Sequence, residues 1–294
     1  MKKFIVRAAV FMAVAVAVFA VEKPYKRFDL NLSFGYARAL IDGSSSAESH
    51  WSMGAFSNIE DETIIKAKAN ASWLAAGALS YYFGRQIGIQ LQVGSMANEA
   101  PPSSVFFFSF TRGGVSTTHR ETWNGSGSFR TLPLSLNLVI GRLGGARFQM
   151  SISGGVTLFV NSFEASGFGG VSIYRAWSEL LPGGRVLLNE AVDAIKIPMT
   201  IAKTAWNAVG GNIGVMASFR LSAAAGLFVE ARYFYCSQKS FYWNWTSGYY
   251  PSLYGGIDAV EYPEDWAIIQ SSITSEFTLN PSFYYAGAGI LISF

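Results

Sequence analysis

The 294-residue chain has little of what enzymes and metalloproteins commonly use. It contains one cysteine, Cys236, and two histidines, His50 and His119. A single cysteine cannot form an internal disulfide, and two isolated histidines without a paired spacing do not predict a metal site. No glycine-rich phosphate loop follows an apolar strand-like segment. His50 has Glu48 and Ser49 nearby, but a serine-rich loop places such neighbours by chance. We therefore expect no enzymatic activity, no metal ion and no cofactor.

Long apolar runs are also missing, except for a short one at the N-terminus. Lys2, Lys3 and Arg7 precede an apolar run over residues 8–19, and Val18-Phe19-Ala20 has the small residues of a cleavage site. This pattern predicts a secretory signal peptide over residues 1–20. It leaves a single mature domain over residues 21–294.

Net charge disappears with that peptide. The full chain has 22 basic and 19 acidic residues, and three of the basic ones belong to the expected signal peptide. The mature chain is then formally neutral, with 22 − 3 = 19 basic residues against 19 acidic ones. A neutral chain has no electrostatic footprint for nucleic acid, so we expect no nucleic-acid partner.

Hydrophobic residues are nevertheless abundant. They make up 50% of the chain, yet beyond the signal peptide no run approaches the ~18 apolar residues that indicate a transmembrane helix. A closed β-barrel is the other structure that satisfies its backbone hydrogen bonds in lipid. Apolar abundance without helical runs therefore favours a membrane β-barrel.

The last segment shows the clearest strand pattern. An apolar row alternates with small or polar residues between Tyr284 and Phe294. A period of two means that one face of a strand meets an apolar medium. A final aromatic residue on such a strand resembles the assembly signal of bacterial outer-membrane barrels, which implies the barrel assembly machinery as a partner during biogenesis.

Alternation of this kind occurs in eight segments of about ten residues. These are residues 28–36, 72–83, 87–94, 131–140, 148–160, 212–221, 227–235 and 283–294. Short connectors alternate with connectors of about 30 to 45 residues, the asymmetry of outer-membrane barrels. The sequence therefore predicts an all-β fold: an eight-stranded antiparallel transmembrane β-barrel with four long extracellular loops, short periplasmic turns and both termini in the periplasm. A soluble β-sandwich is the alternative, but it does not explain the loop asymmetry.

The inward positions of these segments give candidates for lining the lumen. They are Asp29, Gln90, Gln92, Asn137, Met216, Arg220, Phe228, Glu230, Arg232, Tyr285 and Leu291. Eight strands enclose a space that side chains can fill or that holds one small ligand, so we do not expect a wide porin channel. Glu230, Arg232 and Arg220 have two interpretations: a core network that closes the lumen, or a polar gate in a narrow pathway.

The residues before the last strand carry a family resemblance. Thr278-Leu279-Asn280-Pro281, then Phe283-Tyr284-Tyr285 and a glycine-rich final strand, resemble the ending of the OmpW family of eight-stranded outer-membrane barrels. The resemblance implies a narrow hydrophobic channel that passes small apolar molecules and releases them sideways. OmpA-type and OmpX/Opa-type barrels share the architecture.

The long loops have features of their own. Residues 185–196 have apolar positions at helical spacing, which predicts a short amphipathic helix in the third loop. Residues 105–110 followed by Gly113-Gly114 suggest a hairpin in the second. The fourth is rich in aromatics, which predicts a share of the interfacial girdle and an exposed binding surface: Phe241, Tyr242, Trp243, Trp245, Tyr249, Tyr250, Tyr254, Tyr262 and Trp266.

Two functions follow. The first is a narrow, porin-like channel for small, hydrophobic molecules in the outer membrane, with membrane lipids and apolar solutes as partners. The alternative is a surface-exposed adhesin or interaction protein that binds a host or surface ligand through its long loops.

Overall fold

The computed structural model describes residues 27–40, 42–53, 56–83, 86–145, 147–181, 185–245 and 276–294. The expected signal peptide lies outside these residues. Every regular element in the described part is a β-strand. The strands are β1 (Phe28–Ala39), β2 (Asp42–Met53), β3 (Phe56–Lys68), β4 (Ala71–Tyr82), β5 (Ile87–Glu99), β6 (Pro102–Arg112), β7 (Val115–Asn124), β8 (Ser126–Gly144), β9 (Phe148–Leu181), β10 (Arg185–Arg220), β11 (Ala225–Cys236), β12 (Lys239–Tyr242), β13 (Asn244–Trp245), β14 (Glu276–Leu279) and β15 (Phe283–Ser293).

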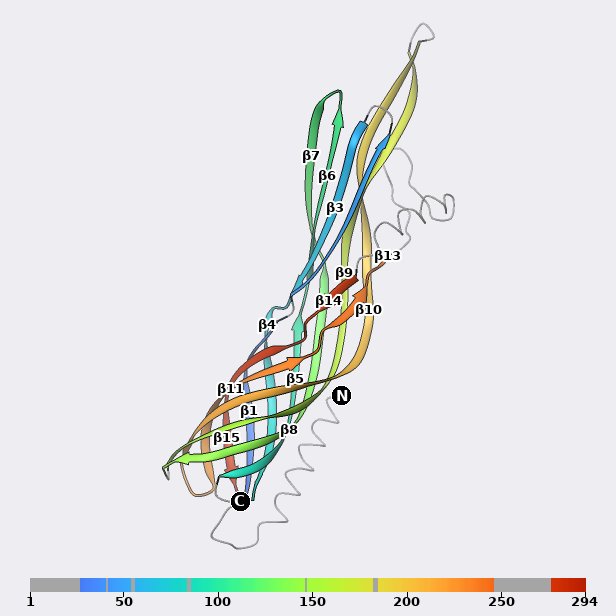
Figure 1. Ribbon diagram of the computed structural model, residues 1–294. Coiled ribbons are helices and arrows are strands. Elements are labelled where there is room, and N and C mark those ends of the chain that lie inside the picture. The colour runs from blue at the N-terminus through green and yellow to red at the C-terminus, as the bar shows by residue number, and fades with distance from the viewer. Residues whose placement is uncertain are drawn as a thin grey trace.

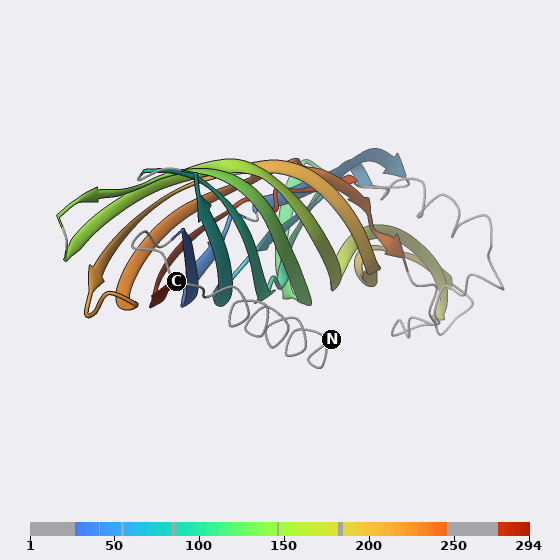
Figure 2. The same ribbon diagram turned by 90° about the horizontal axis from the view of Figure 1, so that it is seen from below.

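Eight of these strands close into a ring (Figures 1 and 2). The order is β11-β15-β1-β4-β5-β8-β9-β10, and a further pairing of β10 with β11 completes the circle. Every pairing in the ring is antiparallel. The ring strands correspond to the eight alternating segments of the sequence. The predicted fold class, an all-β eight-stranded antiparallel barrel, is confirmed.

The strands of the barrel are tilted, and their register measures the tilt. Asp29 of β1 lies opposite Ser80 of β4. Successive partners around the ring lead through β5, β8, β9, β10 and β11 to Phe283 of β15, which lies opposite Ala39 of β1. The circuit returns to β1 at a position 39 − 29 = 10 residues further along. This stagger brings residues far apart in sequence to one level of the lumen.

The outer wall of the barrel is apolar. Phe34, Trp73, Leu136, Ile213 and Val229 are each more than half exposed, and they come from five different ring strands. Monomeric soluble proteins rarely expose a continuous apolar surface of this size. An apolar band around a closed ring is the outer surface of an outer-membrane barrel. The soluble sandwich is therefore excluded, because these rows face outward.

The short turns lie at one end of the barrel, near the C-terminus (Figure 1). Strand β8 continues to Gly144, beyond the alternating segment that ends at residue 140. A register shift between Ile140 and Leu143, with a positive φ of 58° at Arg142, absorbs the bend inside the strand. Such a bulge re-aims the side chains that follow it.

At the other end, the β2/β3, β6/β7 and β9/β10 hairpins extend beyond the ring as a projection (Figure 1). Strands β2, β3, β6 and β7 form a separate four-stranded sheet, and β9 and β10 continue from the barrel as one long hairpin. The predicted second-loop hairpin is confirmed: β6 and β7 are joined by Gly113 and Gly114, both with positive φ, as tight hairpin turns require.

The predicted helix over residues 185–196 is wrong. These residues form the start of β10, and each of them pairs with a residue of β9 between Gly170 and Leu181. Hairpin pairing satisfies the backbone of both segments at once, and it outweighs a helical spacing of apolar residues in one of them. No helix in the described residues is long and apolar enough to cross a membrane.

The aromatic fourth loop is only partly described. Phe241 and Trp243 are buried in the interior, so the expected exposed binding surface is wrong for these two residues, whereas Tyr242 is exposed. Nothing is described of the predicted aromatics between residues 249 and 266. The buried pair extends the apolar core upward from the barrel.

Candidate functional site

An ionic cluster occupies the short-turn end of the lumen. The Asp29 carboxylate of β1 lies 3.2 Å from Nη2 of Arg142 and 3.9 Å from Nη2 of Arg220. The Ser293 hydroxyl donates a third contact to the same oxygen of Asp29. Arg220 also donates to the Gln149 side chain at 3.0 Å. The cluster therefore joins β1, β8, β9, β10 and β15 across the lumen.

Arg232 lies at the middle of the lumen and is 6% exposed. Its Nη2 donates to the Ser153 hydroxyl at 2.7 Å and to Gln90 Oε1 at 3.4 Å, and its Nη1 donates to Asn212 Oδ1. Asn137 Nδ2 donates to the same Gln90 oxygen at 3.1 Å. One guanidinium therefore ties β11 to β5, β9 and β10. Buried hydrogen-bond networks of this kind restrict the core to few arrangements.

The Asn212 amide extends this network around the wall. Its Nδ2 donates to Asn137 Oδ1 and to Thr157 Oγ1, each at 2.8 Å. The Ser135 and Thr157 hydroxyls are 2.9 Å apart. Polar contacts thus form a layer across the lumen, with members from β5, β8, β9, β10 and β11.

Above this layer most of the buried side chains are apolar. A single cluster of buried side chains contains Phe129, Phe159, Phe163, Phe234 and Phe283 from the ring. It continues through Phe241, Trp243, Phe277 and Leu279 of the fourth-loop segments. Phe234 and Phe283 are stacked with ring centroids 4.5 Å apart. The interior toward the projection is thus rich in aromatic side chains, although Asn98, Thr131 and Asn161 are buried among them.

The structure places all the predicted lumen candidates inside the ring. Asp29, Gln90, Gln92, Asn137, Phe228, Arg232, Tyr285 and Leu291 are buried, and Met216, Arg220 and Glu230 are partly buried. The Asn31 amide points at the Met216 sulfur, 3.7 Å away. Glu230 accepts a hydrogen bond from Ser33 at 2.7 Å.

Several important interior residues were not among the candidates. The alternation of the sequence does predict that three of them, Asn212, Ser153 and Ser33, point into the lumen. It does not predict which side chains they contact, because those contacts depend on the stagger of the ring. Arg142 follows the alternating segment 131–140, and the bulge in β8 places its guanidinium over the Tyr82 ring, 4.1 Å from the ring centroid. No pattern in the sequence predicts that bulge.

The projection has a packed interior of its own. Phe106 of β6 is fully buried with its ring against Gly170 of β9, where an added Cβ would lie 2.3 Å from the ring. Thr63 of β3 donates to the Gly170 carbonyl at 3.0 Å. Phe106 continues into a stack with Phe108 and Trp123. The four-stranded sheet is therefore fixed on the β9/β10 hairpin by packing and by hydrogen bonds.

The described side chains that could ligate a metal ion do not gather at one place in the barrel or the projection. His119 of β7 stacks on Phe108, with ring centroids 4.6 Å apart. Among the described residues, no three His, Cys, Asp or Glu side chains come together to hold a metal ion. The polar layer of the interior could close the lumen. The packed projection could present a rigid surface.

Comparison with known proteins adds little. No family model and no curated protein matches the chain. A solved structure of the outer membrane protein OprG from Pseudomonas aeruginosa has 13% identity and a TM-score of 0.43, covering 92% of this chain and 97% of that one. Neisserial surface protein A has 8% identity and a TM-score of 0.35, covering 91% and 97%. Ail, the attachment invasion locus protein of Yersinia pestis, has 9% identity and a TM-score of 0.31, covering 90% and 99%. Scores and identities this low assign no function.

Proposed function

We propose that this outer-membrane barrel is a surface-interaction protein, in which a closed ring anchors a rigid projection that binds a ligand outside the cell. The observation that carries the proposal is the packing of the Phe106 ring against Gly170. A loop needed only to connect strands has no reason to build a second hydrophobic core. A projection held in one conformation pays less conformational entropy when it binds a partner.

The lumen supports this choice. The hydrogen bonds of Arg232 to Gln90, Ser153 and Asn212 form a polar layer across the middle of the barrel. A small apolar solute that crossed the whole lumen would have to break contacts in this layer. Breaking buried hydrogen bonds leaves unsatisfied groups that cost about 1–3 kcal/mol each. Of the two interpretations of the inward charges, the core network fits better than the gate.

Orientation is part of the same proposal. The projection stands on the extracellular side, and the short turns and both termini of the mature chain lie in the periplasm. This assignment follows the rule that outer-membrane barrels have short periplasmic turns and longer extracellular loops. The barrel assembly machinery would insert the chain.

The test is a trimmed barrel. Short turns replace residues 42–68 and 102–124, which removes the four-stranded sheet and leaves every ring strand. Cells displaying the native or trimmed chain are compared for binding to surfaces coated with fibronectin, laminin or heparin. We expect native cells to bind at least one coating and trimmed cells to lose that binding. Retained heat-modifiable gel mobility shows that the trimmed barrel still folds. Equal binding of both cell types to every coating would contradict the proposal.

A second candidate is a short apolar route for small hydrophobic molecules. The apolar cluster from Phe163 through Phe283, continuous with Phe277, is the observation that favours it. An apolar molecule entering from the projection side would meet the polar layer and have to leave sideways into the membrane. Planar-bilayer recording of the native barrel, with hexane-soluble solutes as blockers, tests this route. No conductance and no effect of the solutes would eliminate it.

A further inference from the structure

A band of buried polar side chains lies inside the part of the barrel nearer the projection. Asn98 of β5, Thr131 of β8 and Asn161 of β9 are 4%, 3% and 1% exposed. In the described part of the chain, Nδ2 and Oδ1 of Asn98 have no hydrogen-bond partner. The same holds for Oγ1 of Thr131, Oδ1 of Asn161 and Nε1 of Trp206 in β10. Buried polar groups are nearly always hydrogen-bonded, so a group of them without partners needs an explanation.

The register of the ring places these four side chains together. Thr131 is the partner of Asn161, and Asn161 is the partner of Trp206. Thr131 is also the partner of Met96 on β5, and Asn98 is the next residue of β5 on the same face. Partner residues on neighbouring antiparallel strands have Cα atoms about 4.5–5.5 Å apart and point to the same face of the sheet. The band therefore spans β5, β8, β9 and β10, which are consecutive in the ring.

Aromatic side chains enclose the band on both sides along the barrel axis. Toward the projection, Phe129 is the partner of Phe163, and the Trp206 ring lies 6.4 Å from that of Phe129 between centroids. Toward the short turns, the next inward residue of β9 is Phe159, which meets the Phe234 ring edge-on at 6.3 Å. The four side chains of the band are uncharged. Apolar walls with a few convergent polar groups are the usual composition of a small-molecule site.

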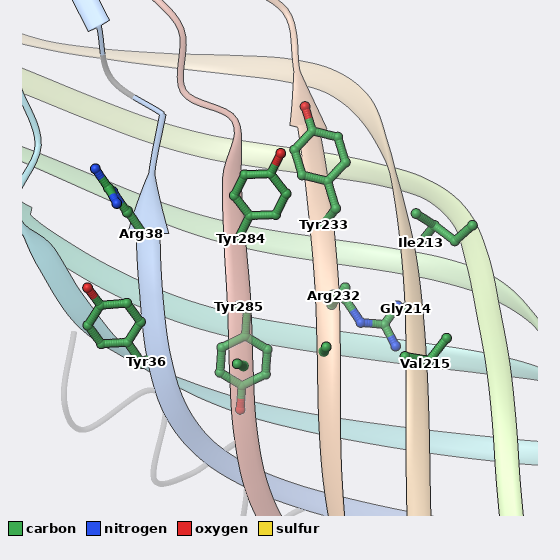
Figure 3. A pocket seen from close by; sticks show the side chains of 11 residues that line it. Tyr36, Arg38, Ile213, Gly214, Val215, Arg232, Tyr233, Tyr284 and Tyr285 are labelled. Carbon is green, nitrogen blue, oxygen red and sulfur yellow. The ribbon is translucent and has the colours of Figure 1, made fainter.

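The band is separate from the polar layer around Arg232. That guanidinium reaches from β11 to the front of Gly214 on β10 (Figure 3), where an added Cβ would lie 2.9 Å from its Cζ. On β9 the polar layer contributes Thr157, and Phe159 stands between Thr157 and the band. The Thr157 hydroxyl is hydrogen-bonded within its layer, whereas that of Thr131 has no partner among the described residues. A molecule bound in the band therefore leaves the polar layer intact.

The unpaired atoms define what the band can bind. The indole Nε1 of Trp206 is a donor only. Oδ1 of Asn161 is an acceptor, and its Nδ2 points at the Cys236 sulfur 3.8 Å away. A hydroxyl group suits this pair because it accepts one hydrogen bond and donates another, and the Thr131 hydroxyl can take either part. A carboxylate or an ammonium group would lose its hydration here without gaining an opposite charge, which is costly.

We propose that the band binds the hydroxyl group of a small uncharged alcohol or phenol. The hydroxyl lies between Trp206 and Asn161 with Thr131 beside it, and the apolar body of the ligand lies against the Phe129 and Phe159 rings. This site goes beyond the surface-interaction role, and it does not require a solute to cross the barrel. An ordered water molecule would satisfy the same polar atoms, and a binding experiment distinguishes it from a ligand.

Fluorine NMR of the barrel in nanodiscs tests the site with two probes of similar shape, 4-fluorophenol and 4-fluorotoluene. Only the phenol carries a hydroxyl group. Empty nanodiscs give the signal of each probe dissolved in lipid. Thr131→Val and Asn161→Leu remove polar atoms of the band with little change in volume. Thr122→Val is the matched control, because Thr122 is exposed on β7 in the projection.

We expect the native barrel to bind 4-fluorophenol at least about tenfold more tightly than 4-fluorotoluene, because the apolar probe leaves the polar atoms of the band unpaired. Thr131→Val and Asn161→Leu should bring the two affinities together, and Thr122→Val should keep them apart. Heat-modifiable mobility verifies folding, and the isosteric Thr131→Val keeps the test decisive if Asn161→Leu does not fold. Equal affinities in the native barrel, or a preference that survives both band variants, would overturn the proposal. Binding of neither probe would overturn it as well, since water alone would then satisfy the band.

Discussion

Ser33 of β1 donates a 2.7 Å hydrogen bond to Glu230 of β11, across the intervening strand β15. Strand β15 presents two glycines, Gly287 and Gly289, at this level of the lumen. The Tyr285 hydroxyl lies over Gly287 and the Phe228 ring lies over Gly289, in the space that side chains there would fill. The interior is thus tied together by polar contacts between strands that share no backbone pairing.

Replacing Arg232 tests whether the polar layer closes the lumen. Arg232→Ala removes the guanidinium and leaves Gln90, Ser153 and Asn212 with lost contacts. We expect a stability loss of about 1–3 kcal/mol in urea unfolding. We also expect higher ion conductance in planar bilayers than the native barrel shows, because water can enter the vacated space. Arg130→Ala, on the outer face, should change neither. Unchanged conductance in a folded Arg232→Ala barrel would show that other groups close the lumen.

Gly214 should be intolerant of even the smallest side chain. A Cβ added there would lie 2.9 Å from Cζ of Arg232, whose position is held by its hydrogen bonds. Gly214→Ala should therefore displace the guanidinium and destabilise the barrel by about 1–3 kcal/mol. Gly77→Ala is the control, since its Cβ would make an ordinary 3.5 Å contact with Leu32. Both are measured by urea titration of heat-modifiable mobility. Equal midpoints for the two variants would contradict the expected rigidity of Arg232.

The barrel could be predicted from the sequence because each ring strand carries the pattern that defines it within its own residues. Each ring strand separates lipid from lumen, so alternation such as that of residues 131–140 marks strand and face together. The contacts inside the lumen are not local. That Arg232 meets Gln90 depends on a stagger accumulated over several strand pairings and on the bulge in β8. The error at residues 185–196 has a similar origin, because the pairing with β9 is invisible in the segment itself.

Cys236 should report on folding. It ends β11, is 1% exposed, and packs in the apolar cluster beside Asn161. A maleimide reagent should therefore fail to label the folded barrel and label the urea-unfolded chain completely. Ser222→Cys supplies an accessible thiol in the exposed turn between β10 and β11, and the folded variant should be labelled at that site. Rapid labelling of Cys236 in the folded native barrel would show that the upper interior opens.

The rigidity of the projection depends on Gly170. Gly170→Ala places a methyl group where the Phe106 ring lies, so the ring must move and the four-stranded sheet must shift away from β9. Overpacking of this kind costs about 1–3 kcal/mol. Gly167→Ala is the matched control on the same strand, because its Cβ would approach the Pro102 ring no closer than 3.4 Å. We expect limited proteolysis to cut the projection of Gly170→Ala faster than that of the native chain or of Gly167→Ala, whereas the heat-modifiable barrel stays intact in all three. If binding at the cell surface depends on a preformed projection, Gly170→Ala should weaken it while leaving the amount of inserted barrel unchanged. Equal proteolysis of the three chains would show that the projection does not depend on this contact.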